Sequence, residues 1–210
     1  MSDFDQTTAD ALAAVLAKTR RAPAAPAAPP DTAEYLRAEC GAPRRHAAVV
    51  ARMDGPWGAK LAALIPRLGT GCILVLHGIN GNGKTQLGVE LMRHQVGVRK
   101  LSAKFTSSME FFMAVKATYR PDAKKDEAAV VAEFTAPKLL VMDEVEKRGE
   151  SEWENHLLFH LVNRRYNDGK DTVMISNLDK AELPAHLGRS LVSRLNQTGG
   201  LVFCDWPSKR

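Results

Sequence analysis

The segment Gly78-Ile-Asn-Gly-Asn-Gly-Lys84-Thr85 constrains this 210-residue chain more than any other feature. It fits the pattern G-x-x-x-x-G-K-[ST], and it stands between an apolar run, residues 72–76, and a segment of helical length, residues 84–97. Its glycines allow consecutive backbone N–H groups to point into one concavity, and the positive end of the following helix attracts anions. The sequence therefore predicts a phosphate-binding loop between a strand and a helix.

The residues of this loop are expected to bind a nucleoside triphosphate and Mg²⁺. Lys84 is placed to reach the β- and γ-phosphates, and the hydroxyl of Thr85 is placed to bind the metal. The candidate nucleotide-binding residues are Gly78, Asn80, Gly81, Asn82, Gly83, Lys84 and Thr85.

A nearly uninterrupted apolar run, residues 138–142, leads directly into two acids, Asp143 and Glu144. Phosphoryl transfer requires a carboxylate partner for Mg²⁺ and an oriented attacking water. We expect Asp143 to bind the metal and Glu144 to orient the water. An acid pair in this position indicates hydrolysis rather than transfer to an organic acceptor.

A third run, residues 172–175, ends at Ser176 and Asn177. Ligands of open parallel sheets bind outside the carboxyl ends of the strands. Asn177 is therefore predicted to hydrogen-bond either the γ-phosphate or the attacking water. GTP-binding proteins read guanine with Asn/Thr-Lys-x-Asp after a comparable strand, and this chain lacks that lysine, so adenine is favoured.

Short apolar runs alternate with segments of helical length over most of the chain. Weaker candidate strands lie at residues 103–106 and 200–204, and the candidate helices span 84–97, 108–119, 126–134 and 151–167. Runs of this kind are typical of strands that are buried on both faces of a parallel sheet. The order predicts an α/β domain with helical layers on a central parallel sheet and right-handed crossovers.

The first third of the chain contains no candidate strand and is predicted to be helical apart from an alanine- and proline-rich linker. Residues 1–21 are predicted to form a helical arm, and residues 22–30, four prolines and otherwise alanine, an extended linker. Residues 31–68 are predicted to form a helical preamble, with helices at 31–40, 44–52 and 58–68 around a Gly-Pro-Trp-Gly break. The ATPase domain is expected to span residues 69–210. By composition alone, the arm is either a partner-binding element or a frayed terminus.

Composition and charge exclude several classes of protein. No run approaches ~18 apolar residues, so no membrane span is expected. The acidic first residues argue against a targeting signal, so we expect a cytoplasmic protein. Three cysteines, Cys40, Cys72 and Cys204, show neither a pairing pattern nor a CxxC spacing, which argues against disulfides and zinc.

The formal net charge of +5 permits a phosphate-bearing partner. Basic residues between Arg93 and Lys125 alternate with aromatic ones, a composition that suits single-stranded nucleic acid. Phenylalanines at helical spacing within this stretch, such as Phe111 and Phe112, fit a hydrophobic core better than a nucleic-acid surface.

Several motifs in this order resemble the AAA+ ATPases of the DnaC helicase-loader and IstB transposition-regulator group. The resemblance covers about residues 43–208, and no single motif after the phosphate loop is specific by itself. It rests on Pro43–His46, Gly78–Thr85, Leu139–Glu144, Trp153, Asn163–Tyr166, Ile175–Leu178, Leu187-Gly188, Ser193–Leu195, Phe203, Trp206 and Ser208.

The resemblance implies a three-layer P-loop AAA+ fold that binds ATP and Mg²⁺. It makes Asp143 and Glu144 the Walker B pair, Asn177 sensor 1, and Arg194 an arginine finger supplied to a neighbouring subunit, with Arg189 as the competing candidate. Only sixteen residues follow Arg194, too few for a C-terminal helical lid. ATP hydrolysis is accordingly expected to be weak and to depend on self-association or DNA.

The function that this resemblance favours is ATP-dependent loading of a replicative hexameric DNA helicase. The arm at residues 1–21 would bind the helicase, and the protein would deliver it to single-stranded DNA. The alternative is an IstB-like regulator that assembles on duplex DNA and activates a transposase, and the residues do not separate the two. A P-loop small-molecule kinase is less favoured, because we find neither an arginine-bearing lid nor an acceptor pocket.

Overall fold

A five-stranded parallel sheet forms the centre of the computed structural model, which describes residues 32–51, 54–149 and 151–206. The strand order is β2-β3-β4-β1-β5, and every neighbouring pair is parallel. The strands are β1 Ile73–His77, β2 Ala103–Ser107, β3 Leu139–Asp143, β4 Asp171–Ile175 and β5 Gly200–Phe203.

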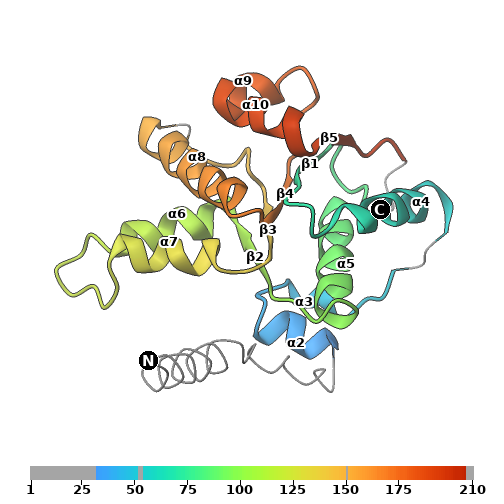
Figure 1. The fold of residues 1–210 in the computed structure, drawn as a ribbon, viewed down its shortest axis with the longest axis horizontal. Coiled ribbons are helices and arrows are strands. Elements are labelled where there is room, and N and C mark those ends of the chain that lie inside the picture. Colours follow the sequence, from blue (N-terminus) through green and yellow to red (C-terminus); the bar gives the residue numbers. More distant parts are fainter. Residues whose placement is uncertain (1–31, 52–53, 150, 207–210) are drawn as a thin grey trace, which may run out of the picture.

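Helices cover both faces of this sheet (Figure 1). One face carries α2 to α5 and the other α6 to α10, which gives the predicted three layers. The bounds are α2 Thr32–Ala38, α3 Arg44–Ala47, α4 Gly55–Leu64, η1 Ile65–Arg67, α5 Lys84–Gly97, α6 Ser108–Ala117, α7 Glu127–Thr135, α8 Glu152–Asn167, α9 Leu183–Leu187 and α10 Arg189–Thr198.

Side chains of each strand alternate between the two cores. In β1, Leu74 and Leu76 pack with α4 and α5, while Ile73 and Val75 pack with α8 and α10. This alternation follows from the two-residue repeat of a strand. Because both faces are covered, β1 is fully buried and reads as an unbroken apolar run.

The prediction of an α/β fold with a central parallel sheet is confirmed, and all five expected strands are present. Two helix boundaries in the preamble were wrong. The helix expected at 44–52 ends at Ala47, and the helix expected at 58–68 begins at Gly55 and gives way to a 3₁₀ turn at Ile65. Pro56 occupies the first turn of α4, where its missing N–H costs nothing, so the Gly-Pro-Trp-Gly segment starts a helix rather than breaking one.

Two further helices, α9 and α10, fill the connection between β4 and β5 and are absent from the predicted elements. The preamble helices pack into the same core as β1 and α5, through Leu36, Trp57 and Leu61. The predicted arm at residues 1–21 and the predicted linker at 22–30 lie outside the described residues.

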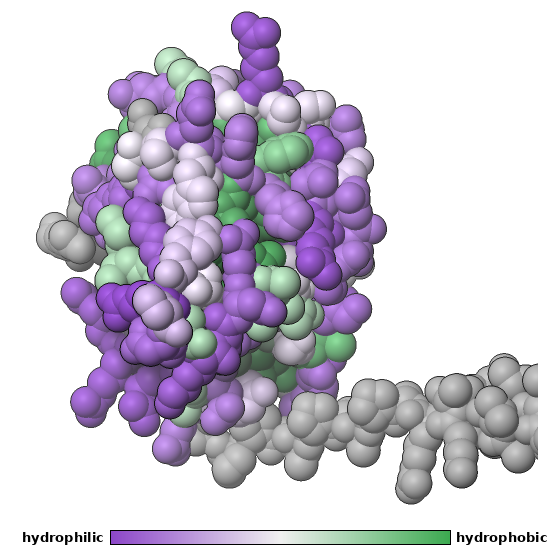
Figure 2. Space-filling view, turned by 90° about the vertical axis from the view of Figure 1, so that its left-hand side faces the viewer, coloured by the Kyte–Doolittle hydropathy of each residue, from purple (hydrophilic) through white to green (hydrophobic). Residues whose placement is uncertain are grey.

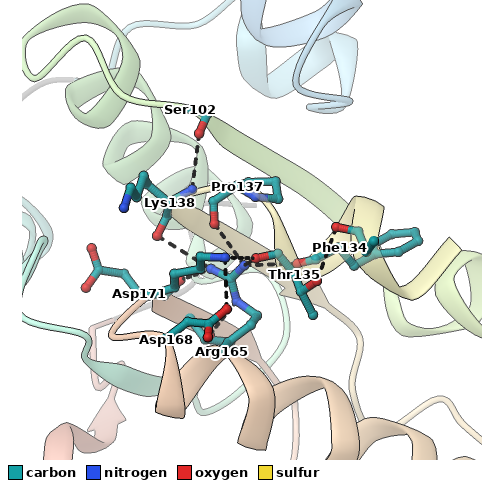
Figure 3. A network of polar contacts seen from close by, with 11 residues as sticks. Ser102, Phe134, Thr135, Pro137, Lys138, Arg165, Asp168 and Asp171 are labelled. Carbon is teal, nitrogen blue, oxygen red and sulfur yellow. Dashed lines mark hydrogen bonds and ion pairs between the residues drawn. The ribbon is translucent and has the colours of Figure 1, made fainter. Parts of the chain in front are cut away.

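A buried guanidinium joins the amino-terminal ends of two strands (Figure 3). Arg165 of α8 is fully buried, and its side chain donates to Thr172 Oγ1 at 2.9 Å and to the carbonyl oxygens of Phe134, Pro137 and Asp171 at 2.9, 2.9 and 2.5 Å. Burial lowers its pKa to about 10, so the group is still a cation at neutral pH. One side chain therefore ties α8 to the end of α7, to the segment before β3 and to the start of β4.

The side chain of Asp171 extends this network to β1. Its carboxylate accepts from the backbone N–H groups of Gly69, Gly71 and Cys72 at 2.5, 3.0 and 3.1 Å. Gly71 has a positive φ of 73°, and a Cβ there would lie 3.1 Å from the backbone of Gly169. The start of β1 is thus fixed by a side chain of the neighbouring strand.

Replacing Arg165 by Met should lower the free energy of unfolding by at least ~3 kcal/mol, because several buried carbonyls lose their donor. At roughly 2–4 °C per kcal/mol for a chain of this size, the change in Tm is large enough to measure by circular dichroism. Arg164→Met, which changes an exposed arginine of the same helix, is the matched control. Equal melting temperatures for the two variants would show that the Arg165 network contributes nothing to stability.

Candidate functional site

The predicted site residues meet at the carboxyl ends of β3, β4 and β1, three adjacent strands of the sheet. Here the chain forms a pocket of about 280 Å³, which we call the loop pocket. It contains every predicted site residue except Gly78, at the start of the loop, and Arg194. Its lining is Arg45, His46, Asn80, Gly81, Asn82, Gly83, Lys84, Thr85, Asp143, Glu144, Ile175 and Asn177.

Backbone geometry explains the glycines of the loop. Gly81 and Gly83 have φ values of 81° and 85°, in the left-handed region that favours glycine. At Gly78 an added Cβ would lie 2.8 Å from the carbonyl oxygen of Cys204. The loop can therefore adopt this path only with glycine at these positions, and it leads directly into the amino end of the 14-residue helix α5.

Lys84 lies under the loop with only 4% of its surface exposed. Its ammonium donates to the carbonyl oxygens of Gly78 and Ile79, both at 2.7 Å, and to Asn82 Oδ1 at 3.2 Å. Burial lowers the pKa of Lys84, and the nearby acidic groups, including Glu146 and Asp143, oppose that shift. A cation is thus held next to the backbone N–H groups that would face phosphate oxygens.

Thr85 and Asp143 lie side by side although 58 residues separate them in the sequence. The Thr85 hydroxyl donates to Asp143 Oδ2 at 2.8 Å, and the backbone N–H of Glu144 donates to Asp143 Oδ1 at 2.8 Å. Burial raises the pKa of Asp143, while these two hydrogen bonds act in the opposite direction. Mg²⁺ takes oxygen ligands and commonly keeps only one or two from protein when phosphates supply others, so this pair fits the metal.

Glu144 has an unusual backbone conformation. Its φ is 56°, and within the described part of the chain only one other non-glycine residue, Lys100, has a positive φ. The turn is held by Ser108 Oγ, which donates to the Glu144 carbonyl at 2.8 Å, and by the N–H of Val145, which donates to Ile175 O at 3.1 Å. The Glu144 carboxylate is partly exposed and pairs with Lys147 at 2.5 Å. Left-handed non-glycine residues of this kind are concentrated at functional sites.

Two tryptophans donate hydrogen bonds to backbone carbonyls of the loop. The indole N–H of Trp57, in α4, donates to Gly83 O at 3.3 Å, and that of Trp206, after β5, donates to Asn82 O. Asn82 in turn donates to Cys204 O at 2.7 Å. Elements before and after the sheet in sequence thereby fix the position of the loop.

Three residues near the pocket are absent from the predicted site, although Arg45 and His46 lie within the Pro43–His46 motif of the resemblance. Arg45 and His46, from α3, line the pocket, and His46 Nδ1 lies 2.9 Å from Gln86 Oε1. Glu146 lies behind Asn177, whose Nδ2 donates to Glu146 Oε1 at 2.6 Å. The only signal available for Glu146 was a third acid within the run Asp143-Glu-Val-Glu146.

Arg194 does not lie in the loop pocket of its own chain. Its Nε donates to Asn163 Oδ1 at 2.7 Å, and its guanidinium lies over the rings of Phe159 and Tyr166, 5.1 and 5.3 Å from their centroids. Arg189, at the start of α10, is exposed and lines a separate hollow beside α8 and α9. The structure brings neither arginine to the site residues of the same copy.

The basic stretch is divided between two sides of the molecule. Arg93 belongs to α5 and pairs with Glu90, whereas Lys116 belongs to α6 and contacts the ring of Trp153. Phe111 and Phe112 are buried in the core, so they cannot stack on bases. Figure 2 shows the α6–α7 side, where hydrophilic side chains surround a narrow apolar strip.

The remaining expectations concern cysteines and membranes. All three cysteines are buried and free, and burial raises the pKa of each thiol, to about 11 for Cys40 and Cys204 and about 12 for Cys72. Among the described residues, no helix combines the length and the apolar character needed to cross a membrane.

Comparisons with known proteins agree with the resemblance. The family described as IstB-like ATP binding protein matches residues 69–194. The replicative helicase loader DnaC of Escherichia coli (strain K12) is 26% identical over 137 residues, which cover 65% of this chain and 55% of that protein. The chain thus spans about half the length of the curated relatives it matches.

Solved structures of two related proteins share the fold. A crystal structure of the DnaC helicase loader superposes with a TM-score of 0.62 at 20% identity, covering 73% of this chain and 93% of that one. A crystal structure of DnaI gives a TM-score of 0.62 at 17% identity, covering 77% and 93%. Because the family match spans more than half of the chain, and the sheet and loop agree with it, the chain belongs to the family of IstB-like ATP binding proteins, with the AAA+ fold of DnaC.

Proposed function

We propose that this protein binds ATP with Mg²⁺ in the loop pocket and hydrolyses it. The observation that carries the proposal is the convergence of Lys84, Thr85, Asp143, Glu144 and Asn177 on one pocket from three adjacent strands. Family membership supports ATP as the nucleotide. The metal and the hydrolytic step rest on the chemistry of these side chains.

Each side chain then has a distinct task. Lys84 and the loop N–H groups bind the β- and γ-phosphates, and Thr85 Oγ1 with Asp143 Oδ2 holds Mg²⁺, which neutralises charge on the phosphate oxygens. Glu144 orients the attacking water and accepts a proton from it. Asn177 supplies a further hydrogen bond at the end of β4.

Glu144→Gln should leave ATP affinity within about twofold and lower turnover by ~10²-fold or more, because it retains hydrogen bonding but cannot accept the proton. Lys84→Ala should instead lose ATP binding while the fold is retained. Titration with a fluorescent ATP analogue and a phosphate-release assay separate the two effects. Lys180→Ala, at an exposed position, is the control. Wild-type turnover of Glu144→Gln, or ATP binding by a folded Lys84→Ala, contradicts these assignments.

We further propose that Arg194 completes the site of a neighbouring copy, so that hydrolysis requires self-association. Two observations support this. Arg194 lies outside its own loop pocket, and its contacts with Asn163, Phe159 and Tyr166 hold the guanidinium in place on α8. A permanently charged guanidinium at the γ-phosphate can raise the rate ~10³–10⁵-fold.

Mixing two inactive variants tests this arrangement. Arg194→Ala retains an intact ATP site, and Lys84→Ala retains an intact arginine, so a mixed interface can combine the two. Partial recovery of ATP turnover is expected, together with specific activity that rises with protein concentration. No recovery, with co-assembly shown by light scattering, rules out Arg194 as a shared residue. Arg189→Ala in the same mixture tests the competing candidate.

We propose that the biological role is loading of a replicative hexameric helicase onto single-stranded DNA. The curated relatives are named replicative helicase loaders, and basic side chains on the α6–α7 side, Lys116, Arg120 and Lys124, provide a surface suited to phosphates. Residues 1–21 are proposed to bind the helicase, with 22–30 as a spacer, 31–68 as a helical preamble and 69–210 as the ATPase domain. An IstB-like role in transposition is the second candidate, because the matching family model is IstB-like.

Deleting residues 1–30 should abolish capture of the replicative helicase of the same organism and leave ATP affinity unchanged, because the loop pocket is built from later residues. Pull-down with purified helicase and an ATP titration measure the two effects. Helicase capture by the truncated protein would move the interface into the ATPase domain. Tight binding to duplex DNA with no helicase capture by the full chain favours the transposition role.

A further inference from the structure

The turn after β3 carries an acid that the roles described so far do not use. Glu146 Oε1 accepts from Asn177 Nδ2 at 2.6 Å, a short bond between the ends of two adjacent strands. Its other oxygen, Oε2, is buried and has no hydrogen-bond partner among the described residues. Among the residues that the structure describes, the carboxylate therefore has one hydrogen-bond partner, the amide of a pocket residue.

This contact fixes which way the Asn177 amide points. An ionised carboxylate can only accept hydrogen bonds, so the atom of Asn177 that faces it must be the amide nitrogen. Asn177 lines the loop pocket and Glu146 does not. With Nδ2 anchored to Glu146, the carbonyl oxygen Oδ1 lies on the opposite side of the amide and is available to a ligand in the pocket.

The backbone holds both partners in place. Val145 N donates to Ile175 O at 3.1 Å, which joins the turn after β3 to the end of β4, and Lys147 N donates to Glu144 O at 2.9 Å within the turn. The two residues that flank Val145 are Glu144 and Glu146. The same turn thus positions Glu144, which is proposed to orient the attacking water, and Glu146, which contacts Asn177.

We propose that Glu146 is a positioning residue, which locks the Asn177 amide so that Oδ1 accepts a hydrogen bond from the water that Glu144 orients. The proposal rests on the proposed hydrolysis of ATP in the loop pocket. Glu146 touches neither nucleotide nor water and acts only through Asn177. Its removal should therefore lower turnover and leave ATP affinity unchanged, whereas a purely electrostatic effect on Lys84 or Mg²⁺ would change affinity.

The first test is Glu146→Gln, with Glu152→Gln, an exposed carboxylate-to-amide change in α8, as the matched control. A glutamine can accept from or donate to Asn177, so both amide orientations become available. We expect kcat to fall about 10- to 100-fold, as for other residues that orient a functional side chain, and ATP affinity to stay within about twofold. In NMR spectra, the hydrogen exchange of the Asn177 side-chain amide should accelerate in Glu146→Gln and stay unchanged in Glu152→Gln.

A double-mutant cycle tests whether Glu146 acts through Asn177. Adding Glu146→Gln to Asn177→Ala should cause no further loss of kcat, because the amide to be oriented is already gone. The reciprocal exchange, Asn177→Asp with Glu146→Gln, should be more active than Asn177→Asp alone, because the introduced amide can donate to the introduced carboxylate.

The outcomes separate this inference from the proposed function. If Glu144→Gln abolishes turnover while Glu146→Gln matches wild type, the positioning role is wrong and the proposed hydrolysis stands. Additive losses in the double mutant, or an unchanged amide exchange rate, also overturn it. If Glu144→Gln and Lys84→Ala both behave as wild type, the proposed function fails and the role of Glu146 fails with it.

Discussion

The buried hydrogen-bond network of Arg165 and Asp171 is the constraint on which the rest of this fold depends. Backbone groups at the amino-terminal ends of parallel strands have no partners within their own ladder, and leaving them buried and unpaired is costly. Arg165 supplies donors to carbonyls before β3 and at the start of β4, and the Asp171 carboxylate supplies acceptors to the N–H groups that precede β1. These contacts fix the relative position of three adjacent strands at their amino-terminal ends.

The candidate site lies at the other end of the same three strands, where their carboxyl termini meet. Because β3, β4 and β1 are neighbours in fixed register, the residues that follow them are brought within hydrogen-bond distance, as Thr85 and Asp143 are. Lys84 and Arg45 contribute positive charge to the pocket. Of three nearby acids, Asp143 ends β3, and Glu144 and Glu146 follow within the next turn. Each acid has a different partner. Asp143 accepts from a threonine hydroxyl, Glu144 pairs with a lysine, and Glu146 accepts from an asparagine amide, so three carboxylates lie in three different environments.

The arginine that the resemblance assigns to catalysis lies away from this pocket, packed on α8 by an asparagine and two aromatic rings. The pocket of a single copy therefore contains the groups proposed to bind phosphate, metal and water, but it does not contain Arg194. Under the proposed role of Arg194, this arrangement would link catalysis to assembly. An isolated chain would then hydrolyse ATP weakly even though its Walker residues are complete.

The sequence by itself determined the phosphate loop, the five strands, their buried character and most helix boundaries, because each depends on neighbouring residues. Glycine spacing, apolar runs and a lysine followed by a threonine are local signals.

Only the tertiary structure decided the features that depend on contacts between distant segments. Phe111 and Phe112 belong to the core rather than to a nucleic-acid surface, and α9 and α10 fill the connection before β5. Arg45 and His46 reach the pocket, and Glu146 reaches Asn177, because packing brings together segments that are far apart in the sequence. The three acids of Asp143-Glu-Val-Glu146 were visible in the sequence, but the partners of Asp143 and Glu146 depend on strand order, which is a property of the folded sheet.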